Sequence, residues 1–258
     1  MKYFQLIFFI LFLQTALISQ NAAIDSLQTL IKVQKEDSNK VKSILELSKQ
    51  YFDTDPKEAI RLAESAVVLG HKIGYTKGAA YGLKNVGIAY YYQGNYIEAI
   101  SLWKKSLAVF DSIHDQLGVA NILSNLGATY YNEGDYNKAL DHYLRSLKVS
   151  EEIKDTLRIV TALLNIGAVY IDKPSTHAKA LEYSEKALEL SEKIEYKEAI
   201  ATSSVNIGEI HFLAGKYDLA LQYFEKSLKY TGGTDGTVYT MVNIRSEEHT
   251  SELQSLEE

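Results

Sequence analysis

The sequence predicts an all-α fold, a solenoid built from antiparallel helix pairs. The motif Asn-X-Gly returns at steps of 40, 40 and 41 residues. Apolar residues around the motif follow the three-and-four spacing of an amphipathic helix. Only 2 prolines occur in 258 residues, so few helices are interrupted. A repeat of this length indicates stacked units that share a continuous core. The motif begins at Asn85, Asn125, Asn165 and Asn206.

The chain begins with a segment typical of a secretory signal peptide. Lys2 precedes an unbroken apolar run over residues 6–13, which is too short to span a bilayer comfortably. We expect residues 1–19 to be a signal peptide cleaved near Ser19, and an uncleaved membrane anchor is the alternative. Residues 20–37 are expected to form a helical lead-in.

The repeat divides the rest of the chain into five units and the start of a sixth. The first unit lacks the Asn-X-Gly motif and keeps only Ala59 at its alanine position. Each unit is predicted to hold two helices separated by a turn, as at Gly134, because glycine commonly follows a helix C-terminus. The expected units span residues 38–76, 77–116, 117–156, 157–197 and 198–230, and the truncated sixth spans residues 231–244.

Small residues recur inside the predicted helices. A glycine in a helix costs about 1 kcal/mol relative to alanine, so its recurrence indicates that two helices approach closely. In the third unit we expect Gly127 and Ala139 to let the helices cross, with Tyr130 filling the wedge beside them.

These positions resemble the tetratricopeptide repeat family. Its pattern has a tyrosine three residues after the glycine, an alanine twelve after it, and an aromatic residue four after the alanine. Trp103, Tyr143 and Phe224 supply that aromatic, and Ser184 replaces it in the fourth unit. The long step and the missing closing proline are similar to the long-helix branch that includes kinesin light chain. The resemblance covers roughly residues 38–244 and implies a right-handed superhelical solenoid.

The resemblance also implies that the first helix of each unit lines a groove for an extended protein or peptide partner. An asparagine side chain offers donors and an acceptor to a peptide backbone. Bracing of a neighbouring helix is the alternative for the asparagines, and packing between helices is the alternative for the tyrosines. The expected groove residues are Asn85, Asn125, Asn165, Asn206, Tyr81, Lys84, Tyr91, Asn121, Tyr131, Thr161, Thr202 and Phe212. Since later units carry Ser124, Leu164 and Val205 at the position of Lys84, no basic clamp is expected.

The last residues depart from the repeat. Residues 245–255 begin where the next motif glycine is due, and they resemble the translation of a common sequencing-library adapter. We therefore expect residues 245–258 to be a non-native tail and the natural protein to continue. A natural acidic tail is the alternative.

Composition argues against several functions. The chain has no cysteine, and its 6 histidines lack the spacing of metal ligands, so we expect no metal, no cofactor and no catalytic site. The formal net charge of −6 offers no basic face for nucleic acid.

The predicted function is a protein-binding scaffold exposed outside the cytoplasm, in the periplasm or on the outer face of a bacterial inner membrane. A signal peptide followed by such an array resembles the sensory part of membrane histidine kinases and nucleotide cyclases, in which a later segment reaches the membrane. Two alternatives stay open: a free-standing periplasmic adaptor, and a fragment of such an enzyme without its catalytic domain.

Overall fold

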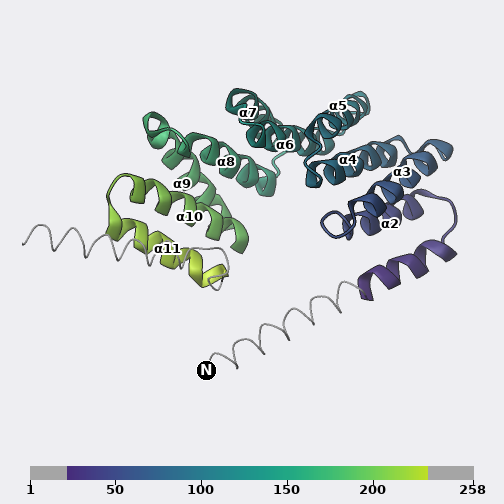
Figure 1. Ribbon diagram of the computed structural model, residues 1–258, viewed down its shortest axis with the longest axis horizontal. Coiled ribbons are helices and arrows are strands. Elements are labelled where there is room, and N and C mark those ends of the chain that lie inside the picture. The colour runs from purple at the N-terminus through teal and green to yellow at the C-terminus, as the bar shows by residue number, and fades with distance from the viewer. Residues whose placement is uncertain (1–21, 232–258) are drawn as a thin grey trace, which may run out of the picture. The chain divides into compact units, whose positions relative to one another are not determined.

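A computed structural model describes residues 22–231 of the chain, and their regular structure is helical throughout (Figure 1). The expected signal peptide, the start of the sixth unit and the tail lie outside the described residues. A helix over residues 22–33 comes first. Ile24, Leu27 and Ile31 of this helix pack against the apolar cluster of the helices that follow. The prediction of an all-helical repeat solenoid is confirmed.

Helix pairs make up the rest of the described chain. Consecutive helices pack against each other from α2 to α5 and from α7 to α11, and short links between them make neighbouring helices antiparallel. The chain divides into two compact units within α6, at residues 122 and 123, and each unit is described by itself. The pairs are α2 (Ser38–Lys49) with α3 (Pro56–Lys72), α4 (Thr76–Tyr92) with α5 (Tyr96–Ser112), α6 (Gln116–Asn132) with α7 (Tyr136–Glu152), α8 (Thr156–Ile171) with α9 (His177–Lys193), and α10 (Lys197–Leu213) with α11 (Tyr217–Thr231).

A three-residue link, residues 133–135, joins α6 to α7. Gly134 has a φ of +76°, a conformation that glycine adopts without steric cost. The Asp135 N–H donates to the Tyr130 carbonyl at 2.9 Å, which closes the first helix. The Asp135 carboxylate then accepts from the Lys138 N–H at 3.1 Å and caps the second helix.

The motif glycines make room for aromatic rings. A Cβ added at Gly127 would lie 2.6 Å from the Tyr143 ring, and one added at Gly87 would lie 2.3 Å from Trp103. The side chain that lies closest to Gly127 is therefore the Tyr143 ring. Ala139 is fully buried, and Tyr130 is 8% exposed.

The fourth pair departs from this arrangement. Ser184 stands in place of the ring, is fully buried, and its hydroxyl has no hydrogen-bond partner. The inserted residue lies in a short 3₁₀ helix, η1 (Pro174–Thr176), between α8 and α9. The Thr176 hydroxyl donates to the Tyr170 carbonyl at 2.6 Å, so a side chain closes α8 where the second, third and fifth units use a glycine turn.

Candidate binding groove

The motif asparagines brace neighbouring helices at two of the four positions. Asn85 is 1% exposed, and its Nδ2 donates to the Leu45 carbonyl of α2 at 3.1 Å. Asn165 Nδ2 reaches the Ser124 hydroxyl of α6 at 3.4 Å, which is a weak bond. At Asn85 the structure therefore shows the bracing role, because a peptide would have to displace a buried hydrogen bond. The side chains of Asn125 and Asn206 are half-buried.

Aromatic pairs recur at the end of the first helices. Tyr91, Tyr131 and Phe212 are half-buried. Each lies against the tyrosine that opens the following helix, with ring centroids 5.6, 5.4 and 5.8 Å apart. These partners are Tyr96, Tyr136 and Tyr217. Sequence reasoning treated these three tyrosines only as part of a turn, although their spacing from the groove aromatics is the same in all three units.

A second set of aromatic contacts lies between the two helices of a pair. Tyr130 stacks on His142 with centroids 5.3 Å apart, and Tyr170 stacks on Tyr183 at 5.8 Å. Packing, the alternative for these tyrosines, is what the structure shows. His211, which takes the place of a tyrosine, lies 5.7 Å from Tyr223.

A polar cluster surrounds Asp172 in the second compact unit. The Asp172 carboxylate lies close enough to the phenols of Tyr131 and Tyr136 to interact electrostatically with both. Burial and then the Asp172 charge raise the pKa of Tyr131, and the Asp172 charge raises the pKa of Tyr136. Loss of hydration, followed by the Asp172 charge, also raises the pKa of Glu209. This part of the groove thus combines carboxylates with phenols.

The hydroxyls of the two predicted groove threonines are bonded within their own helices. The hydroxyl of Thr161 donates to the Leu157 carbonyl, and that of Thr202 donates to the Glu198 carbonyl, both at 2.9 Å. Each donor is thus satisfied within its own helix. Asn121 is half-buried at the corresponding position of α6.

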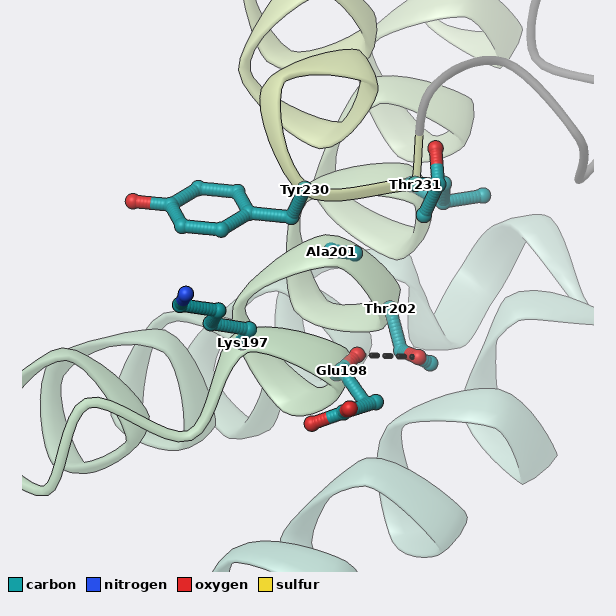
Figure 2. Close-up of a pocket in the computed structure, with 7 residues that line it drawn as sticks. Lys197, Glu198, Ala201, Thr202, Tyr230 and Thr231 are labelled. Atoms are coloured by element: carbon teal, nitrogen blue, oxygen red, sulfur yellow. Dashed lines mark hydrogen bonds between the residues drawn. The ribbon is translucent and has the colours of Figure 1, made fainter.

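A hollow of about 490 Å³ lies beside α10 and the end of α11 (Figure 2). The Tyr230 side chain projects from α11 on the same side as Lys197. The hollow includes the predicted groove residue Thr202. It also adjoins residue 231, the position at which the sixth unit is expected to begin. It is lined by Lys197, Glu198, Ala201, Thr202, Val205, Tyr230 and Thr231.

A second hollow, of about 310 Å³, lies between the first helices of the first two units, α2 and α4. It contains Lys84 together with Lys42, Lys49 and Lys77. The sequence comparison that predicted no basic clamp concerned the later units, because the first unit lacks the motif that would align it. The lining residues are Lys42, Leu45, Glu46, Lys49, Tyr75, Lys77, Gly78, Tyr81, Lys84 and Asn85.

The charges of this second hollow are partly paired. Lys49 bonds Glu46 at 2.7 Å, and Lys77 bonds Asp115 at 2.9 Å. The bond to Asp115 raises the pKa of Lys77. The Lys84 amine lies 5.2 Å from the centre of the Tyr81 ring, within the range of a cation–π contact.

The fold and its recurring residues define a repeat scaffold, and comparison with known proteins gives the family. The tetratricopeptide repeat profile matches residues 78–152 and 158–230, which is more than half of the chain. The protein belongs to the tetratricopeptide repeat family. No match was found among curated proteins.

Solved structures of similar fold share little sequence with this chain. BtubC (BKLC) from P. vanneervenii is 15% identical with a TM-score of 0.66, covering 85% of this chain and 91% of its own. Aspartyl phosphate phosphatase F from Bacillus subtilis is 16% identical with a TM-score of 0.65. The match covers 81% of this chain and 58% of the phosphatase. PH0952 from Pyrococcus horikoshii, a signal transduction ATPase with a tetratricopeptide repeat sensor, is 19% identical with a TM-score of 0.62. The match covers 92% of this chain and 40% of PH0952. These similarities show the fold.

Proposed function

We propose that the protein is a scaffold that holds an extended segment of a partner protein against the first helices of its repeats. The carrying observation is the recurrence of half-buried aromatic residues at Tyr91, Tyr131 and Phe212, each packed against a second ring. Aromatic side chains are favoured anchors at protein interfaces. A ring already held by a neighbour loses less conformational entropy when a partner binds.

We further propose that the scaffold acts outside the cytoplasm as the sensory part of a longer signalling protein. The signal-peptide pattern of residues 1–19 supports export. The Pyrococcus horikoshii protein, whose own repeats are described as a sensor, supports the sensory role by analogy of fold. A free-standing adaptor and an enzyme fragment remain the alternatives, and one structural neighbour is named as a phosphatase.

The described helices add one finding about membranes. Among residues 22–231, no helix is both long enough and apolar enough to cross a bilayer.

Peptide display on the full chain tests the scaffold proposal. Peptides selected on the protein should lose at least tenfold in affinity for the double variant Tyr131→Ala, Asn165→Ala, which removes an anchor and an amide from the groove. A tenfold loss corresponds to about 1.4 kcal/mol. The matched control is Asn137→Ala with Lys148→Ala, two exposed residues of α7. Equal affinity for the groove variant and the control, with both variants folded, rejects the groove.

A further inference from the structure

Two aromatic rings meet at the surface where the first two helix pairs turn. Phe52 lies in the link between α2 and α3, and Tyr92 is the last residue of α4. Their rings stack with centroids 6.2 Å apart and an angle of 17° between the ring planes. Tyr92 is 58% exposed, and Phe52 is half-buried. These two rings, here called the aromatic shelf, therefore leave aromatic surface open to a partner.

Neighbouring rings hold the aromatic shelf in place. The Tyr91 ring meets the Tyr92 ring edge-on with centroids 6.0 Å apart, and it packs against Tyr96 at 5.6 Å. Tyr91 also lies 6.0 Å from Trp103, which is buried. The exposed ring of Tyr92 is thus joined to the core through ring contacts. A partner that binds a ring held in this way loses less free energy to the ordering of side chains.

Other tyrosine rings of this chain are already occupied by its own cations. Lysine amines lie over the rings of Tyr130, Tyr170 and Tyr183, at 5.2, 5.4 and 5.9 Å from the ring centroids. In the described part of the chain, no lysine or arginine lies in this way over Phe52 or Tyr92. The aromatic shelf can therefore accept a cation from outside.

The two turns that carry the aromatic shelf are acidic. Residues 50–58 and 93–98 hold four carboxylates and one lysine. One of these carboxylates, Glu58, is paired with Arg61 at 2.6 Å. Asp53, which directly follows Phe52, and Glu98, in the first turn of α5, are both exposed. The charge around the rings is thus complementary to a cationic partner.

A planar guanidinium suits this combination of rings and carboxylates. It stacks on aromatic faces and binds carboxylates through paired N–H groups, whereas a lysine amine acts as a point charge. Alternate side chains of an extended chain lie on one face about 6.6 Å apart, similar to the 6.2 Å between the two rings. We propose that the aromatic shelf binds two arginines, separated by one residue, on an extended segment of the partner. The proposal rests on the scaffold function and names the chemistry recognised by one part of the scaffold.

Fluorescence anisotropy with the full chain tests the aromatic shelf. The probe is a labelled glycine–serine peptide that carries two arginines separated by one serine. We expect it to bind the parent protein, and Tyr92→Leu to weaken binding at least about threefold, because leucine keeps apolar surface but lacks an aromatic face. Asp53→Asn with Glu98→Gln should weaken binding by at least about the same factor, because the carboxylates no longer pair with the guanidinium groups.

Two control variants match these changes at other exposed positions. Tyr230→Leu replaces an exposed tyrosine of α11. Glu64→Gln with Asp111→Asn removes the same charge from exposed positions on α3 and α5. Each control should change the affinity by less than about twofold, since surface charges at a distance are screened by salt. Circular dichroism checks that all variants keep their helices.

Each contrary result overturns the proposal in a recognisable way. Failure of the arginine peptide to bind, or equal losses in the shelf and control variants, shows that the shelf is not a specific site. Equal binding of a peptide with lysines in place of the arginines shows that only charge is recognised, and equal binding with leucines shows an apolar docking surface instead. In all these cases, display-selected peptides that respond to Tyr131→Ala, Asn165→Ala would leave the scaffold function standing.

Discussion

Replacing a motif glycine by alanine should have opposite effects in the third and fourth units. Alanine is favoured over glycine in a helix by about 1 kcal/mol, and both Gly127 and Gly167 lie within helices. At Gly127 the new Cβ would lie 2.6 Å from two atoms of the buried Tyr143 ring. Overpacking of this kind costs about 1–3 kcal/mol. The net result for Gly127→Ala is a loss of up to about 2 kcal/mol.

At Gly167 the obstacle is much smaller. The nearest atom to the new Cβ is the Ser184 hydroxyl at 2.9 Å, and the next lies at 3.6 Å. Because this hydroxyl has no hydrogen-bond partner, it can rotate away without losing a bond. We therefore expect Gly167→Ala to be neutral or to stabilise the protein by up to about 1 kcal/mol.

Urea denaturation followed by far-UV circular dichroism measures both variants. In thermal melts, 1 kcal/mol corresponds to about 2–4 °C for a domain of 150–250 residues. The order of stability should be Gly167→Ala, then the parent protein, then Gly127→Ala. If Gly127→Ala is as stable as Gly167→Ala, the ring does not require the glycine, and the packing argument fails.

Three further predictions concern single residues. Lys154 has a φ of +56°, so Lys154→Gly should raise the free energy of unfolding by about 1 kcal/mol in urea titrations, and a loss would show that Lys154 is not strained. Asn85→Ala leaves the Leu45 carbonyl without its partner, so the melting midpoint should fall by an amount equivalent to about 1–3 kcal/mol, and an unchanged midpoint would mean that Asn85 does not brace α2. Burial, followed by the charge of Lys216, lowers the pKa of His211, so the unfolded chain binds a proton more readily than the folded one. The contribution to stability should thus be complete above the unfolded histidine pKa of about 6.5 and decline as pH falls below it. His211→Tyr should reduce this decline below about pH 6.5, whereas equal urea midpoints for both proteins at each pH would contradict the assignment.

Much of the local structure follows from the sequence because each signal acts over a few residues. The glycine of Gly134-Asp135 predicted a turn, since its conformation depends only on its own backbone. The departure of the fourth unit at Ser184 was also visible as a break in the repeat. The ring that occupies the space beside Gly127 was not, because only three-dimensional packing places Tyr143, sixteen residues away, against this glycine.

The candidate site was predicted less completely than the fold. The sequence placed Tyr91, Tyr131 and Phe212 among the groove residues, but the rings that hold them became apparent only from the contacts across the turn. For Asn85 the sequence left open whether it faces a ligand or braces a helix, and the structure shows its amide buried against α2. Whether an asparagine amide faces a ligand or braces a helix depends on which helix packs against it. A single sequence does not contain that information.

By itself, the sequence determined the repeat, its helical character and the family, because a period of forty residues and the spacing of apolar positions are properties of the chain alone. Tertiary structure decided which residues share a surface. Lys42, Lys49, Lys77 and Lys84 are separated by up to 42 residues and belong to units that look different in sequence. They line one pocket because the first helices of successive units pack side by side, so the charge of this surface emerges only when the units stack.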